Sequence, residues 1–292
     1  MFSSIALASG IAAGNSGCAT APVYLKESLD LALLGISLDD IMFAPQNPTD
    51  IYSTLHELLT QYAIKSKQLT AKKNCFFALG GDHACAIGTW SGVAESIKKE
   101  GSLGLLWIDA HMDAHTPETS ESGNIHGMPL AALLGYGDKR LTSILSLTPK
   151  VLPCNVALIG IRSYEAGEQA LLEKLGVRIY YMPEIRARGL QNITREAVDI
   201  VTKQTIGYGI SFDLDSLDPH TIKAVGTPVE HGIMPQEMLD ALPSLIQEKL
   251  IAFEFVEYNP QRDINGLSLQ FIKTMFYQVA QELQVLSNCT SV

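Results

Sequence analysis

The chain alternates between short apolar runs and longer segments with helical periodicity. Seven apolar runs predict buried strands, at residues 4–8, 75–79, 103–108, 156–159, 177–181, 209–212 and 251–256. Between them, apolar residues recur at intervals of three and four, which predicts helices at residues 86–99, 165–175, 195–204, 236–247 and 267–283. Strands that alternate with helices predict an α/β fold: a mainly parallel sheet with helices on both faces.

The beginning of the chain resembles a secretory signal in its apolar and small residues, but the first basic residue is Lys26. A signal peptide has a basic start, so we interpret this segment as a buried first strand. The sequence holds no internal repeat and no long linker, which predicts a single domain over residues 1–292. It also holds no run of 18 apolar residues, so we expect no membrane span.

Charge and cysteine content narrow the partners and the compartment. The 21 basic and 31 acidic side chains give a formal net charge of −10. This balance disfavours nucleic acid and anionic lipid and suits a small cationic ligand. The 5 cysteines are odd in number and show no C-x-x-C spacing, so neither a disulfide framework nor a zinc-thiolate site is indicated. A reducing compartment, the cytoplasm, is therefore expected.

Four of the predicted strands are followed directly by acids and histidines. In a parallel sheet, ligands bind beyond the carboxyl ends of the strands, so these side chains should meet at one edge. The four groups are His83 in FFALGGDH, then Asp109, His111, Asp113 and His115 in LLWIDAHMDAH, then Asp213 and Asp215 in ISFDLDSLDP, and Glu257 in FEFVEYNP.

The spacing within two of these groups is typical of metal ligands. In D-x-H-x-D and D-x-D, alternate residues of an extended backbone point to one side. Four carboxylates with two imidazoles form a donor set that hard or borderline divalent cations such as Mn²⁺ prefer. Because buried like charges repel, so many carboxylates require more than one cation. Each acid alone could equally be a helix cap, but caps do not require both motifs after two separate buried strands.

Longer motifs around these residues resemble a known family. GGDH, IDAHMDAHTPETSESGNIHGMP, SFDLDSLDP and VEYNP look like the ureohydrolases, and within that superfamily they are similar to the arginases. The resemblance implies a three-layer α/β/α sandwich around a mostly parallel, eight-stranded sheet. It also implies a homo-oligomer, either a trimer or a hexamer, that converts L-arginine to L-ornithine and urea.

The resemblance further implies two Mn²⁺ per subunit. One ion would be held by His83, Asp109, Asp113 and Asp213, and the other by Asp109, His111, Asp213 and Asp215. Asp109 and Asp213 would then bridge the two ions, and a hydroxide between them would attack the guanidinium carbon.

Three residues are assigned catalytic roles on the same basis. Glu257 would orient the guanidinium, Asp113 would pass a proton to the departing amine, and His126 in SGNIHG would relay a proton from solvent. Glu254, earlier in the same strand as Glu257, is interpreted as an acid without a catalytic role.

The expected substrate contacts match the arginase pattern only in part. Ser122 and Asn124 match arginase residues that bind the α-carboxylate, and Glu168 matches one that meets the α-ammonium. His115 and Glu165 depart from the arginase pattern, where Asn and Asp are usual. The predicted substrate-binding set is His115, Ser122, Asn124, Glu165, Glu168 and Thr227.

These departures keep a second ureohydrolase activity open, on agmatine or a guanidino acid, with a non-catalytic metal-binding homologue as a further alternative. A binuclear metallophosphatase is disfavoured, because the sequence lacks the GNH[DE] signature.

Overall fold

A nine-stranded sheet runs through the computed structural model, which describes residues 1–14, 16–38, 40–146 and 148–289. The strand order is β2-β1-β4-β9-β8-β5-β6-β7, with β3 also paired to β1, and every pairing among named strands is parallel. The strands are β1 (Phe2–Ala8), β2 (Ile36–Ser37), β3 (Ile41–Phe43), β4 (Phe76–Gly80), β5 (Leu103–Ile108), β6 (Val156–Ile161), β7 (Arg178–Tyr181), β8 (Gly207–Asp213) and β9 (Leu250–Val256).

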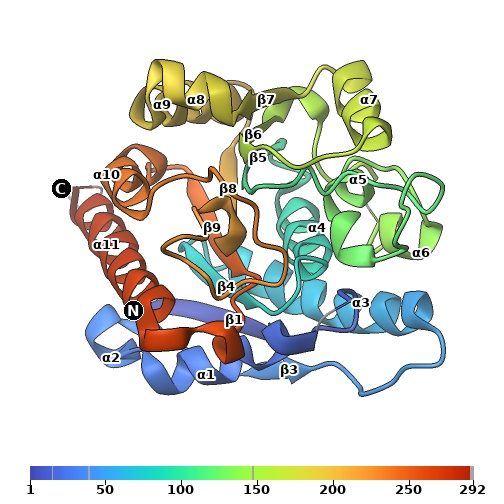
Figure 1. The fold of residues 1–292 in the computed structure, drawn as a ribbon, viewed down its shortest axis with the longest axis horizontal. Coiled ribbons are helices and arrows are strands. Elements are labelled where there is room, and N and C mark those ends of the chain that lie inside the picture. Colours follow the sequence, from blue (N-terminus) through green and yellow to red (C-terminus); the bar gives the residue numbers. More distant parts are fainter. Residues whose placement is uncertain (15, 39, 147, 290–292) are drawn as a thin grey trace.

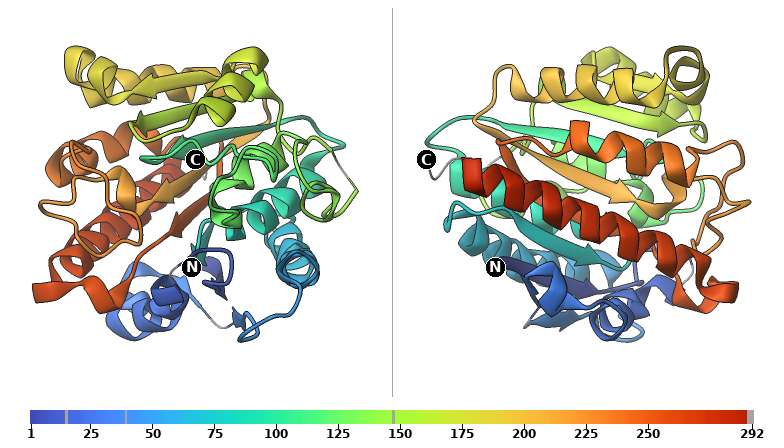
Figure 2. Two further views of the ribbon diagram at one scale, coloured as in Figure 1. Left: turned by 45° about the vertical axis from the view of Figure 1, so that its right-hand side comes forward. Right: turned by 90° about the vertical axis from the view of Figure 1, so that its left-hand side faces the viewer.

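Helices cover both faces of this sheet (Figure 1). The helices are α1 (Ala21–Ser28), α2 (Leu31–Leu34), α3 (Ile51–Thr70), α4 (Cys85–Ile97), α5 (Pro129–Leu133), α6 (Lys139–Thr142), α7 (Ala166–Leu175), α8 (Met182–Arg188), α9 (Leu190–Thr202), α10 (Pro235–Leu245) and α11 (Leu267–Cys289). One core cluster joins the sheet to α1, α2 and α8 to α11, and a second joins it to α3 to α7. Figure 2 shows α11 lying over the sheet, on the face that carries the first core cluster.

The predicted α/β/α class is confirmed, and the strand count needs one correction. All seven predicted strands are present, and the apolar start of the chain forms β1. The ninth strand arises because β2 and β3 pair with successive parts of β1, at Phe2 to Ser3 and at Ala6 to Ala8.

The register of the sheet brings the four acid-bearing strand ends level. Strands β4, β9, β8 and β5 are adjacent in that order. A row of paired residues crosses them at Leu79, Phe255, Phe212 and Ile108. Because the strands are parallel, the residues that follow this row emerge at one edge of the sheet.

The GGDH turn after β4 is held by the ends of β1 and β9. Gly81 donates its N–H to the Leu7 carbonyl at 3.0 Å, and its own carbonyl accepts the Glu257 N–H at 2.8 Å. A Cβ on Gly81 would lie 1.9 Å from the Ser9 carbonyl oxygen. Glycine is therefore required here, because two backbone segments approach each other closely. The same approach fixes the backbone position of the turn that carries His83.

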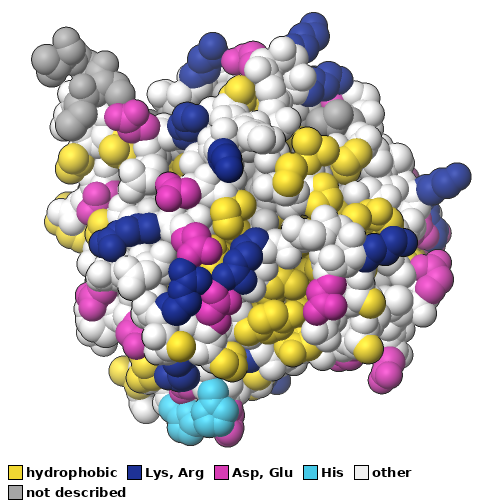
Figure 3. Space-filling view, turned by 90° about the horizontal axis from the view of Figure 1, so that it is seen from above, with side chains coloured by type: hydrophobic (Ala, Val, Ile, Leu, Met, Phe, Trp, Pro, Cys, Tyr) yellow, Lys and Arg dark blue, Asp and Glu magenta, His cyan; other side chains and the backbone are white. Residues whose placement is uncertain are grey.

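The surface on the α8 and α9 side mixes acidic and basic side chains (Figure 3). Glu184 pairs there with Arg178 at 2.5 Å and with Arg188 at 2.6 Å, so neighbouring charges neutralise one another. Cys75, Cys85 and Cys154 are free thiols. Among the described residues, no helix is both long and apolar enough to cross a bilayer.

The close approach at Gly81 generates a stability prediction. Gly81→Ala should lower the free energy of unfolding by about 2 kcal/mol or more, because the new methyl group must push the β1 end away from the turn. Urea unfolding followed by circular dichroism measures this. Gly127→Ala is the control, since its added Cβ would meet nothing closer than His115 Cδ2 at 3.8 Å. Equal stability of the two variants would contradict the packing described.

Candidate metal centre and substrate pocket

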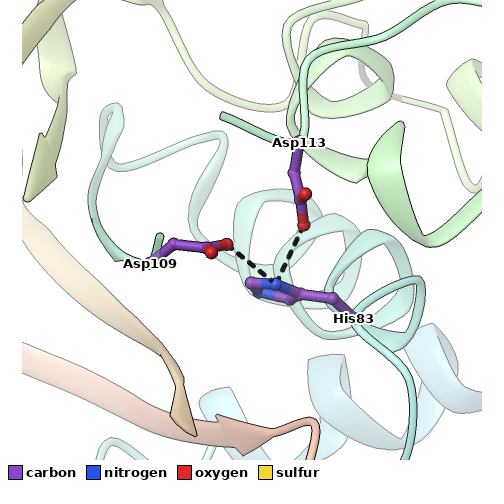
Figure 4. Close-up of side chains that lie close together, drawn as sticks. All are labelled: His83, Asp109 and Asp113. Carbon is purple, nitrogen blue, oxygen red and sulfur yellow. Dashed lines mark ion pairs between the residues drawn. The ribbon is translucent and has the colours of Figure 1, made fainter. Parts of the chain in front are cut away.

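His83 is the meeting point of three carboxylates. Its Nδ1 lies 3.2 Å from Asp109 Oδ2, 3.0 Å from Asp113 Oδ2 and 3.1 Å from Asp213 Oδ2. Figure 4 shows two of these carboxylates pointing at the same ring nitrogen. Within the described part of the chain this buried nitrogen has no partner with hydrogen-bond geometry. Four atoms that can act as metal ligands therefore face one another, as in a site that could hold a cation.

A second group of donors forms around His111. Its Nδ1 lies 3.2 Å from Asp215 Oδ2 and 3.5 Å from Asp109 Oδ1. Asp109 thus turns one oxygen toward His83 and the other toward His111, which is the arrangement expected of a bridging carboxylate. Asp213 has been predicted to bridge as well. Its Oδ2 faces His83, while its Oδ1 accepts the Asp215 N–H at 2.8 Å.

The electrostatics of these donors fit divalent cations. Burial and the charge of Asp109 raise the pKa of Asp113 to about 6. Burial and the charge of Asp215 hold the pKa of Asp213 well above its ordinary value. Burial alone would lower the pKa of His83, but the surrounding carboxylates outweigh it and hold that pKa well above the ordinary value. The cluster therefore demands positive charge, which protons or metal ions can supply.

Two of the predicted site residues adopt left-handed backbone. The φ angle is 49° at Asp113 and 65° at Glu257. Such a conformation is uncommon for residues other than glycine and persists where the surrounding structure enforces it. At Glu257 the backbone N–H bond to Gly81 enforces it. Both side chains are thereby turned toward the donor clusters.

Glu257 is buried and forms a pair with the half-buried His126 beside the His83 cluster. Glu257 Oε1 accepts the His83 N–H at 2.8 Å and lies 3.1 Å from His126 Nδ1. Burial would lower the pKa of His126, but the bond and charge of Glu257 outweigh burial and raise it to about 9. His126 is therefore a cation near neutral pH, held by a carboxylate.

A pocket of about 230 Å³ opens above the clusters. Its described lining includes no Lys or Arg, and such a pocket favours a cationic ligand. The lining contains twelve of the predicted residues, namely His111, Asp113, His115, Ser122, Asn124, His126, Glu165, Glu168, Asp213, Asp215, Thr227 and Glu257. His83 and Asp109 are fully buried and lie outside the lining.

The predicted substrate contacts at the pocket mouth partly bind one another. His115 Nε2 lies 2.7 Å from Glu165 Oε2, and His115 Nδ1 lies 3.2 Å from Thr119 Oγ1. Glu168 accepts the N–H groups of Glu165 and Ala114 at 3.0 and 3.2 Å, and burial raises its pKa to about 8. Both ring nitrogens of His115 are thus engaged within the protein.

The other predicted contacts are simpler. Ser122 Oγ accepts the Asn124 N–H at 3.2 Å, which ties these two residues into one turn of the lining. Thr227 donates to Asp215 Oδ2 at 2.9 Å, so this hydroxyl supports a metal-ligand candidate from within the protein.

Sequence reasoning missed the buried side chains behind the clusters. Trp107 donates to Asp109 Oδ2 at 2.9 Å and stacks on the His83 ring, with the ring centres 4.1 Å apart. Ser211 Oγ lies 2.9 Å from His83 Nε2 and donates to Glu254 at 2.6 Å. One signal in the sequence could have pointed to them. Glu254 is a charged residue in the middle of an otherwise apolar strand.

Comparisons with known proteins show the family of this chain. The model of the arginase family matches residues 6–281. The chain is 47% identical to the arginase of Brevibacillus brevis over 191 residues, which are 65% of this chain and 63% of that relative. The chain thus spans just under two thirds of that relative's length in the sequence match.

Solved structures match over nearly the whole chain. The arginase of Bacillus caldovelox superimposes with a TM-score of 0.87 at 32% identity, over 96% of this chain and 97% of that one. The arginase of Entamoeba histolytica gives a TM-score of 0.86 at 27% identity, over 95% and 97%. The fold of this chain is therefore that of these arginases. The chain belongs to the arginase family.

The His126–Glu257 pair predicts a pH-dependent stability. The pKa of His126 is raised in the folded state, so its stabilisation is complete below about 6.5 and is lost as pH rises through about 9. The stability difference between the wild type and His126→Asn should therefore shrink over this window by on the order of 2–3 kcal/mol. Urea unfolding of metal-free protein between pH 6 and 10 tests this.

His220→Asn is the control for that series, because it removes a histidine whose side chain is 72% exposed. A constant difference between wild type and His126→Asn at every pH would contradict the proposed ion pair.

Proposed function

We propose that this chain hydrolyses the guanidino C–N bond of L-arginine to give L-ornithine and urea, with two Mn²⁺ per subunit. The observation that carries the proposal is the position of Asp109 at the base of an acidic pocket. One of its oxygens faces His83 and the other faces His111. Membership of the arginase family supports the hydrolase class. The similar Entamoeba histolytica structure is a complex with L-ornithine, which supports the substrate.

The donor set fits the metals that we propose. His83 and His111 would each bind one ion, and Asp109 would bind both, with Asp113, Asp213 and Asp215 completing the set. Carboxylate and imidazole ligands of this kind suit Mn²⁺, and no thiol lies among them. When bound, the ions would neutralise the buried carboxylates and activate a water molecule for attack.

The side chains around the pocket would then guide the reaction. Glu257 would hold the planar guanidinium by charge-assisted hydrogen bonds and so fix its carbon over the clusters. The water oxygen would bond to that carbon as the C–N bond to the amine breaks. Asp113 would carry the proton from the water to the leaving amine. His126 borders the pocket and would relay the next proton from solvent.

The α-amino acid end of arginine would lie at the pocket mouth. Ser122 and Asn124 would bind the α-carboxylate, and the acidic pair Glu165 and Glu168 would face the α-ammonium. The contact between His115 and Glu165 favours a second candidate, a guanidino compound that lacks one α-group. To bind arginine as proposed, this contact must open or be shared with the ligand.

A urea-release assay tests the substrate. With Mn²⁺-loaded protein, kcat/KM for L-arginine should exceed that for agmatine or guanidinobutyrate by at least about tenfold, because losing one buried polar contact costs about 1.4 kcal/mol or more. Chelator-treated protein should release no urea. A preference for agmatine or guanidinobutyrate would replace arginine as the substrate, and undiminished activity after chelation would contradict the metal assignment.

Glu257→Gln tests the proposed guanidinium contact. The amide keeps the shape of the side chain but removes its charge, so kcat/KM should fall about 10- to 100-fold while two Mn²⁺ remain bound. Glu248→Gln, an exposed replacement before β9, is the matched control and should behave like wild type. Wild-type kinetics in Glu257→Gln would remove this residue from the mechanism.

A further inference from the structure

Glu254 is a fully buried carboxylate in the apolar strand β9. Its Oε2 accepts from Trp90 Nε1 at 2.9 Å and from Ser211 Oγ at 2.6 Å, and its Oε1 lies 3.7 Å from the Cys85 thiol. No Lys or Arg pairs with it among the described residues. A buried carboxylate without a cationic partner costs free energy, so its retention here calls for a reason.

The hydrogen bonds around Ser211 have a defined direction. A serine hydroxyl has one proton, and Glu254 Oε2 accepts it. Ser211 Oγ can then only accept from its other partner, His83 Nε2, at 2.9 Å. In the neutral ring, which is the form that can bind a cation, the proton therefore sits on Nε2, and the lone pair on Nδ1 faces the carboxylates of the cluster. Burial raises the pKa of Glu254, and the nearby His83 and Ser211 oppose that rise.

The orientation of the ring is fixed from a second side. Trp107 stacks on His83 with the planes 9° apart, so the imidazole cannot rotate away from Ser211. Its indole N–H also donates to Asp109 Oδ2, which faces His83 Nδ1. Both tryptophans of the chain thus serve the same centre, Trp107 directly and Trp90 through Glu254.

We infer that Glu254 is a positioning residue of the metal centre, which acts through Ser211 to keep His83 in the form that binds a cation through Nδ1. The inference rests on the proposed function, since it concerns the ion on the His83 side. It gives a positioning role to Glu254, which the sequence analysis interprets only as an acid without a catalytic role. Outer partners of this kind orient histidine ligands and strengthen metal binding by about 10- to 100-fold.

The test is Mn²⁺ binding, followed by the electron paramagnetic resonance signal of the free ion. Glu254→Leu and Ser211→Ala should each lower the affinity for the ion on the His83 side by about 10- to 100-fold. The ion on the His111 side should stay bound. In Glu254→Leu the freed Ser211 hydroxyl can donate to His83 Nε2, which favours the wrong tautomer. The double variant should bind no more weakly than the poorer single variant, because both changes interrupt one path.

A conservative variant separates this role from simple packing. In Glu254→Gln the amide oxygen can still accept from Ser211 and Trp90 while its NH₂ group faces the Cys85 sulfur, so most of the Mn²⁺ affinity should return. Glu95→Leu is the matched control, because Glu95 on α4 binds Lys98 and Ser146 and its loss should not affect metal affinity.

Four outcomes decide the matter. Wild-type affinity for both ions in Ser211→Ala and Glu254→Leu would overturn the inference alone. Equal weakening in Glu254→Gln and Glu254→Leu would overturn the relay through Ser211. If Glu254→Leu fails to fold, Ser211→Ala decides. A wild-type protein that binds no stoichiometric Mn²⁺ would overturn the proposed function, and this inference with it.

Discussion

The constraint on which the structure depends is the burial of several like charges at one edge of the sheet. Four adjacent parallel strands end in level register, and the backbone that follows them places aspartates against His83 and His111. Such a cluster is unfavourable unless positive charge enters it. The sheet supplies the rigidity that holds the carboxylates together, and a bound pair of cations would supply the compensation.

Three further features near the donor clusters cost free energy, and each has a use at this site. Asp113 and Glu257 adopt left-handed backbone, and Glu254 is a buried carboxylate that pairs with no Lys or Arg within the described ranges. Each feature orients a donor or a substrate contact. Trp107 belongs to both the core and the site, because its ring is buried in the core while its N–H donates to Asp109. Stability and site geometry are therefore coupled through shared side chains.

Sequence patterns predicted the central sheet well because buried parallel strands are continuous apolar runs. They yielded no prediction for α3, although Leu55, Leu58, Leu59 and Tyr62 follow helical spacing, because polar residues between them weaken the signal. The metal-ligand candidates were predictable because their spacing is local. The Glu254–Ser211–His83 contacts join separate strands, so only register reveals them.

The most direct measurement is an anomalous difference map at the manganese edge from crystals of Mn²⁺-loaded protein. The account predicts two peaks per chain, one beside His83 Nδ1 and one beside His111 Nδ1, with Asp109 between them. No peak beside these nitrogens, or a peak only at the His115, Glu165 and Glu168 group, would contradict the central claim.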